Sequence, residues 1–178
     1  MNEISQYLEF YKKSPQFFKF NENINIIVDE DQLNEYVNKE KYQLGIVFKN
    51  KYFSLVVDLV ENTNGSRYPY ARIINHNKYN GVVIIPKIDN RIVFCKQFRH
   101  GTREFEIELP RGFSERSKNI YENAESEVIE ELGAEPKNIE YIGNIVSDSG
   151  LSGGLVHIFV CDIDSVSRLA ANEGIMDT

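Results

Sequence analysis

Three glutamates crowd one short stretch of the chain, at positions 127, 130 and 131. On an α-helix, spacings of three and four residues bring Glu127, Glu130 and Glu131 onto one face. Like charges so placed oppose the helix by roughly 0.2–0.5 kcal/mol per pair. No basic residue occurs between Lys118 and Lys137 to balance them. Oxygen ligands without nitrogen or sulfur suit Mg²⁺ or Mn²⁺, so the spacing predicts a divalent metal site. A purely solvated acidic face is the plainer alternative.

The flanking residues predict the elements that would position these carboxylates. Asn119, with Glu122 three residues later, forms a capping-box pattern at the start of a helix. Gly133 suits the left-handed residue that closes a helix. Residues 105–110 alternate as in a half-buried strand. The apolar positions of the helix predict the stripe that faces the core: Tyr121, Ala124, Val128 and Leu132.

This stretch resembles the signature of the Nudix hydrolases, G-x5-E-x7-R-E-U-x-E-E-x-G-U, in which U is a bulky aliphatic residue. The matching positions are Gly112, Glu127, Val128, Glu130, Glu131 and Gly133. Three positions depart from the pattern. Lys118 stands in place of the first Glu, Ser126 in place of the Arg, and Ala134 in place of a larger aliphatic residue.

The flanks extend the resemblance to the ADP-ribose pyrophosphatase branch of that family. Residues 95–113 are similar to its strand–loop–strand lead-in, and residues 139–163 to the two strands that follow the helix. The resemblance implies an α/β fold: a Nudix-type α/β/α sandwich with a mixed sheet, preceded by an N-terminal antiparallel β extension.

The resemblance also implies roles for particular residues. Glu127, Glu130 and Glu131 would bind Mg²⁺ or Mn²⁺, together with the backbone carbonyl of Arg111. Glu173, in a late loop, matches the position of the general base in the branch, although Glu130 or Glu131 acting directly is an alternative.

Three further residues are candidates for substrate binding. Arg99 and Arg111 flank the predicted metal site, and a guanidinium suits bidentate phosphate contacts. Arg99 is favoured over Arg111, because in the family an arginine at its position reaches the diphosphate or a ribose. Glu108 lies in the strand before the signature, where relatives place a carboxylate. A plain solvent-facing role stays open for all three.

The implied function is metal-dependent hydrolysis of a nucleoside diphosphate linked to another moiety. The first candidate is a cytoplasmic enzyme that converts ADP-ribose to AMP and ribose 5-phosphate. Another sugar nucleotide is the second candidate substrate. A non-catalytic nucleotide-binding domain, acting as a sensor or regulator, is the alternative that the substitutions at Lys118 and Ser126 favour.

Bulk properties narrow the class of protein. The chain has 178 residues and a net charge of −7, which argues against a nucleic-acid-binding surface. No apolar run approaches the ~20 residues that span a bilayer. Cys95 and Cys161 lie in apolar, strand-like runs and are expected to be buried free thiols.

The chain is expected to divide near residue 75. Residues 1–75 would form an N-terminal extension that the resemblance associates with a homodimer, and residues 76–178 the Nudix domain, apparently short at its C-terminus. The extension is expected to hold helices at 4–13 and 31–39 and strands at 42–49, 52–60 and 68–76. Later strands are expected at 81–88, 91–98, 105–110, and on either side of a turn within 139–163.

Overall fold

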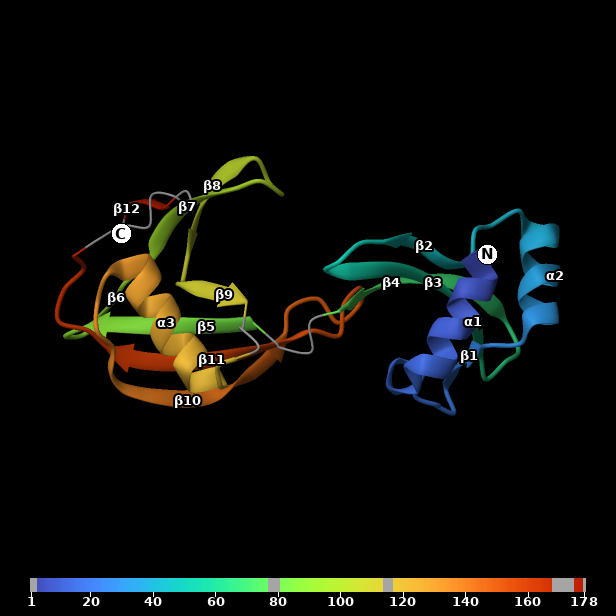
Figure 1. Ribbon diagram of the computed structural model, residues 1–178, viewed down its shortest axis with the longest axis horizontal. Helices are drawn as coiled ribbons and strands as arrows, with labels where there is room; N and C mark the ends of the chain where they lie inside the picture. The colour runs from blue at the N-terminus through green and yellow to red at the C-terminus, as the bar shows by residue number, and fades with distance from the viewer. Residues whose placement is uncertain (1–2, 77–80, 114–116, 168–174, 178) are drawn as a thin grey trace. The chain divides into compact units, whose positions relative to one another are not determined.

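The computed structural model describes residues 3–76, 81–113, 117–167 and 175–177, and its chain divides into two compact units (Figure 1). Unit 1 comprises Met1–Lys78 and Asp148–Gly153, and unit 2 comprises Tyr79–Ser147 and Gly154–Thr178. None of the helices in the described ranges is long and apolar enough to cross a membrane.

Unit 1 is an antiparallel sheet with helices packed on it. Its longest strand, β3 (Phe53–Asn62), pairs with β4 (Arg67–Asn75), β1 (Ile24–Ile27) and β2 (Gly45–Lys49). The helices are α1 (Glu3–Lys13), the single turn η1 (Pro15–Phe17) and α2 (Glu30–Glu40). The expected antiparallel extension is therefore confirmed. The short strand β1 was missed by the sequence analysis.

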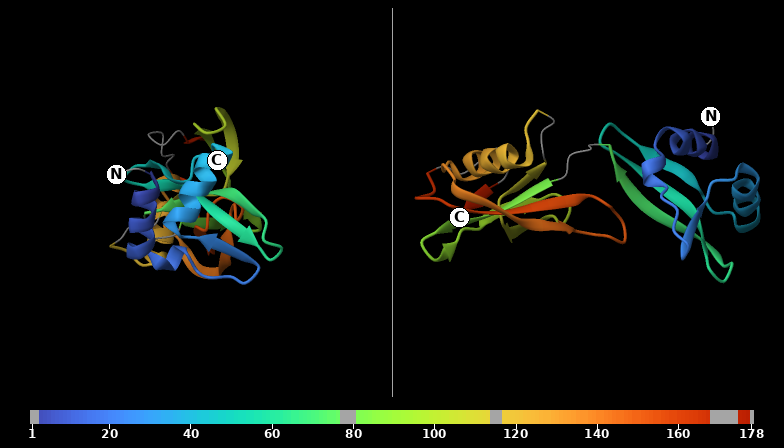
Figure 2. Two further views of the ribbon diagram at one scale, coloured as in Figure 1. Left: turned by 90° about the vertical axis from the view of Figure 1, so that its right-hand side faces the viewer. Right: turned by 90° about the horizontal axis from the view of Figure 1, so that it is seen from below.

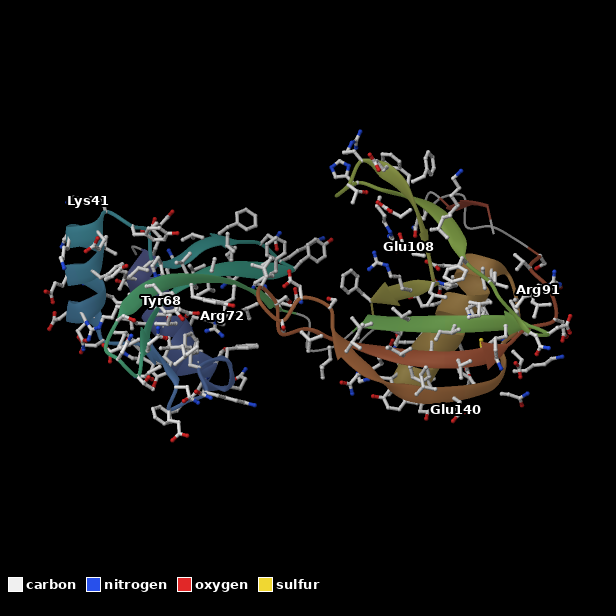
Figure 3. All side chains as sticks on the ribbon, turned by 180° about the vertical axis from the view of Figure 1, so that it is seen from behind. Lys41, Tyr68, Arg72, Arg91, Glu108 and Glu140 are labelled. Atoms are coloured by element: carbon white, nitrogen blue, oxygen red, sulfur yellow. The ribbon has the colours of Figure 1, made fainter. Side chains whose placement is uncertain are left out.

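A buried ionic network lies inside unit 1. Asp58, on β3, is 1% exposed. Its carboxylate accepts a hydrogen bond from the Tyr7 hydroxyl at 2.6 Å and pairs with the Arg72 guanidinium at 2.5 Å. Arg72, labelled in Figure 3, also donates to the carbonyl of Phe17. One carboxylate thus ties α1, η1 and β4 to the central strand.

Unit 2 is built on a mixed sheet. Its central strand β5 (Gly81–Ile88) runs parallel to β11 (Leu155–Asp162), and β11 pairs antiparallel with β10 (Lys137–Val146). Two short strands, β6 (Arg91–Ile92) and β9 (Arg111–Phe113), pair antiparallel with β5. The predicted α/β class with a mixed sheet is confirmed.

A second sheet in unit 2 carries two of the candidate site residues. It joins β7 (Cys95–Arg99) antiparallel to β8 (Glu104–Glu108) and to β12 (Ile175–Asp177). The expected single strand over 91–98 is wrong. The chain leaves the first sheet after Ile92 and enters the second at Cys95, so the strand breaks where its pairing partner changes.

Helix α3 (Ile120–Leu132) covers one face of the first sheet, as the right-hand view of Figure 2 shows in gold. It is the one helix in the described part of unit 2. Three members of the predicted apolar stripe, Ala124, Val128 and Leu132, are fully buried, whereas the fourth, Tyr121, is 44% exposed. They pack in one cluster with core residues of the sheet, among them Val82, Ile84, Phe159 and Cys161.

Both cysteines are free and buried, as predicted. Burial raises the pKa of Cys161 to about 11, with a further contribution from the neighbouring charge of Asp162.

Candidate active site

Both ends of α3 are fixed by local hydrogen bonds. The Asn119 side chain accepts from the backbone N–H groups of Tyr121 and Glu122, at 2.9 and 3.0 Å. The Glu122 carboxylate accepts from the Asn119 N–H at 2.7 Å, which completes the predicted capping box. Gly133 has the predicted left-handed conformation, with φ of 58°. These bonds fix both ends of the helix, and so fix the direction in which its glutamates point.

Glu131 is the buried carboxylate of the site. The residue is only 2% exposed, and one oxygen of its carboxylate accepts a hydrogen bond from the backbone N–H of Arg111 at 3.2 Å. This contact joins the last turn of α3 to β9. A buried carboxylate is stable in such a position only when donors or cations surround it.

The ladder between β9 and β5 also orients the carbonyl of Arg111. The Ile84 N–H donates to the Pro110 carbonyl at 2.9 Å, and Val83 lies opposite Arg111. Because hydrogen-bonded and non-bonded pairs alternate in an antiparallel ladder, Arg111 falls in a non-bonded pair. Its N–H and carbonyl therefore both point away from β5, toward the side on which Glu131 binds the N–H.

Glu127 lies against the glycine that opens the signature. A Cβ placed on Gly112 would stand 1.9 Å from a carboxylate oxygen of Glu127. Only a residue without a side chain leaves this carboxylate room against β9. The structure thus brings Glu127 and Glu131 to adjacent residues of one strand. Glu130 is exposed and lies on the solvent side of the same helix turn.

The donors beside β9 suit a divalent metal only in part. Within the described ranges, no three His, Cys, Asp or Glu side chains form a ready cluster for an ion. The donors beside β9 are instead two carboxylates, on Glu127 and Glu131, and the outward carbonyl of Arg111. All are oxygen donors, as a hard cation requires. The residues present therefore fit Mg²⁺ or Mn²⁺ in the type of their donors.

Glu108 joins the two candidate arginines. Its carboxylate pairs with the Arg99 guanidinium through both oxygens, one contact being 2.9 Å, and with Nε of Arg111 at 2.6 Å. Burial raises the pKa of Glu108, but hydrogen bonds from Arg99 and Arg111 outweigh it and hold the pKa below its usual value. Figure 3 labels Glu108 on β8.

In β8 the apolar side chains are exposed and Glu108 is largely buried, which is the reverse of the pattern expected of a half-buried strand. Ile107 is 74% exposed and Phe105 is 51% exposed, whereas the Glu108 side chain is only 17% exposed. The expectation that apolar residues of this strand face the core is wrong. Glu108 lies opposite the buried Cys95 on β7, and its inward side chain is compensated by the two guanidinium groups.

The two departures from the signature contact each other. Lys118 donates from Nζ to Oγ of Ser126 at 3.0 Å, and Ser126 donates to the carbonyl of Glu122 at 2.9 Å. Asn123, only 3% exposed, donates to the carbonyls of Lys118 and Asn119. The segment before α3 is thereby bound to the helix. Asn123 was not predicted from the sequence, although its position four residues after the N-cap was the available signal.

Cys95 lies opposite Glu108 in the ladder between β7 and β8. Burial raises its pKa to about 12, with further contributions from the charges of Glu131 and Glu108. The remaining predicted residue, Glu173, lies outside the described residues.

Comparison with known proteins gives the fold and the ancestry. No model of a protein family matches the chain. The chain is 25% identical over 96 residues to the ADP compounds hydrolase NudE of Escherichia coli (strain K12), a match over 54% of this chain. It is 27% identical over 114 residues to a methanol dehydrogenase activator of Bacillus methanolicus, a match over 64% of this chain. These matches span 51% and 60% of the two relatives' own lengths.

A solved structure has the same fold. The crystal structure of an ADP compounds hydrolase superimposes with a TM-score of 0.61 at 20% sequence identity, over 71% of this chain and 69% of that chain. Glu127 and Glu131 of the signature lie beside β9, two curated proteins are distant homologues and the fold is shared, so the chain is a distant homologue of Nudix hydrolases and has the fold of an ADP compounds hydrolase.

Proposed function

We propose that this chain hydrolyses the diphosphate bond of a nucleoside diphosphate linked to a second moiety, with ADP-ribose as the first substrate to test. The observation that carries the proposal is the buried carboxylate of Glu131, bonded to the backbone N–H of Arg111 at 3.2 Å. A carboxylate kept beside an outward carbonyl and a second carboxylate, Glu127, would suit a hard divalent cation, whose charge would offset that of a diphosphate.

The chain's own residues would hold and orient the reactants. Glu127, Glu131 and the Arg111 carbonyl would bind the ion, with Glu130 as a further ligand from the solvent side. A bound Mg²⁺ or Mn²⁺ neutralises phosphate charge and lowers the pKa of an attacking water. Glu173 is proposed as the general base that accepts the water's proton. The water oxygen bonds to one phosphorus as the bridging P–O bond breaks, so ADP-ribose and water give AMP and ribose 5-phosphate.

The choice of substrate class draws on the relatives. One curated relative and the matched crystal structure are both named as hydrolases of ADP compounds. Arg99 and Arg111 both bind Glu108, and the three groups together leave one net positive charge beside the carboxylates, which suits a diphosphate. Sugar nucleotides carry the same diphosphate and form the second group of substrates.

The test is metal-dependent cleavage across a panel of ADP-ribose, several sugar nucleotides and a dinucleotide. Release of AMP from ADP-ribose with Mg²⁺ or Mn²⁺, abolished by Glu131→Gln, is the expected result. Thermal unfolding of Glu131→Gln gives the control, since the neutral amide still accepts a hydrogen bond from Arg111. Cleavage that survives Glu131→Gln removes Glu131 from the metal site.

A regulatory binding module is the second candidate. One relative is named as an activator of another enzyme, and Lys118 and Ser126 replace two charged residues of the family signature. Ligand binding without cleavage anywhere in the panel would establish this candidate. Turnover of any panel member would overturn it.

We also propose a homodimer assembled through unit 1. Unit 1 exposes several large apolar side chains, among them Phe48 at 50% and Tyr52 at 62%. Light scattering coupled to size exclusion tests this, with a mass of about twice 20.6 kDa expected. A monomeric mass at the enzyme's working concentration contradicts it.

A further inference from the structure

The structure favours Arg111 for the diphosphate contact, whereas the sequence favours Arg99. Arg99 and Arg111 are bound to the same carboxylate, Glu108, but in different ways. Arg99 donates from Nε and from one Nη to the two oxygens of Glu108, so one edge of its guanidinium is already bound to an anion. Its side chain is 29% exposed. Arg99 is thus largely neutralised where it stands.

Arg111 is held by one nitrogen only. Its Nε donates to Glu108 at 2.6 Å, and its side chain is 51% exposed. Among the residues that the structure describes, neither of its terminal Nη groups has a hydrogen-bond partner. Those two groups carry four of the five guanidinium N–H donors and form its planar end, which fits two oxygens of a phosphate.

The backbone of Arg111 connects this end to the carboxylates. The N–H of Arg111 binds Glu131 at 3.2 Å, while the side chain of the same residue reaches Glu108. A ligand bound at Glu127 and Glu131 therefore lies one arginine side chain away from a fixed guanidinium. Fixing Nε beforehand lowers the conformational entropy lost when the Nη groups bind an anion.

We propose that Arg111 is the residue that contacts the diphosphate, and that Glu108, itself anchored by Arg99, positions Arg111 without touching the substrate. This rests on the proposed function and assigns its diphosphate contact. The trio of Arg99, Glu108 and Arg111 carries one net positive charge, located on the exposed guanidinium. Arg99 is then a supporting residue, although the sequence favours it for the diphosphate contact.

The experiment measures binding of ADP and of adenosine by calorimetry, for the wild-type chain and for Arg111→Gln, Arg99→Gln and Glu108→Gln. Adenosine lacks the diphosphate and is the matched control ligand. Arg111→Gln is expected to weaken ADP binding at least about tenfold, as for loss of a charged hydrogen bond, and to leave adenosine binding unchanged. Arg99→Gln is expected to lower the unfolding temperature, because it leaves half-buried Glu108 with one partner fewer.

A double-mutant cycle separates positioning from plain structural support. If Glu108 acts through Arg111, then Glu108→Gln weakens ADP binding in the wild-type chain but has no further effect once Arg111→Gln is present. Effects that simply add overturn the positioning role. ADP affinity unchanged in Arg111→Gln overturns the contact itself.

Turnover keeps this inference distinct from the proposed function. Cleavage of ADP-ribose by the wild-type chain, with ADP affinity independent of Arg111, leaves the hydrolase standing and removes the inference. ADP binding that depends on Arg111, without cleavage of any substrate, supports the inference and removes the proposed hydrolase activity. A wild-type chain that neither binds ADP nor cleaves any substrate overturns both.

Discussion

Replacing Gly112 with alanine should disable the site while leaving the fold intact. The added Cβ would stand 1.9 Å from an oxygen of Glu127, whereas ordinary contact begins at 3.4 Å. The carboxylate must therefore retreat by about 1.5 Å. It can do so, because it is the end of a flexible side chain and Gly112 is not among the residues with positive φ.

The expected loss follows from that displacement. A 1 Å misplacement of a positioned group costs up to about 10²-fold in rate, so turnover should fall by roughly two orders of magnitude. Stability should change little, since no buried apolar atom is displaced. The metal concentration at half-maximal activity should rise as well, because Glu127 is one of the proposed ligands.

The assay is steady-state hydrolysis of ADP-ribose at varied Mg²⁺, together with thermal unfolding. Gly101→Ala is the matched control, since a Cβ there meets no atom within 4 Å. Activity of Gly112→Ala within about twofold of that of Gly101→Ala would refute the close approach of Glu127 to β9. A large fall in unfolding temperature would instead show that Gly112 is needed for the fold.

Three further outcomes are expected. Asp58→Asn removes the buried charge that pairs with partly exposed Arg72, and should lower the free energy of unfolding by about 3–5 kcal/mol in urea denaturation. A loss below about 1 kcal/mol would contradict the buried network. The folded pKa of Glu108 lies below its unfolded value, so the stability that it contributes is complete above about pH 4.3 and is lost as the pH falls through the folded pKa. The stability difference between wild type and Glu108→Gln should therefore shrink between pH 7 and pH 3, and a constant difference would argue against the ion pairs. The double variant Lys118→Glu with Ser126→Arg should form an ion pair across the present 3.0 Å contact and raise turnover. Ser126→Arg alone places two cations side by side and should lower turnover. Equal effects of the double and single variants would exclude coupling between the two positions.

The sequence was sufficient for α3 and its glutamates. Capping by Asn119, closure by Gly133 and the apolar stripe are all interactions within about four residues, so their spacing predicts the helix and its bounds. The same local rules predicted the α/β class and several strands of both units, but not β1, β9 or the break between β6 and β7. Hydrophobic periodicity is fixed by backbone geometry, which is why these predictions were confirmed.

Pairing between distant segments was decided only by the tertiary structure. Residues 111–113 lie beyond the strand expected at 105–110, yet they form β9 because β5 offers an edge to which they bind. The strand expected at 91–98 breaks because its two halves join different sheets.

The surroundings of Glu108 were likewise decided by the tertiary structure. Alternation in β8 indicates two faces but not which one is buried, since that depends on what each face meets. Here Glu108 meets Arg99 from β7 and Arg111 from β9, and the two cations compensate its half-buried charge while Ile107 faces solvent. The sequence by itself determined which residues could do the chemistry. Their partners depended on contacts between strands, because a charge is stabilised by neighbours in space and not by neighbours in the chain.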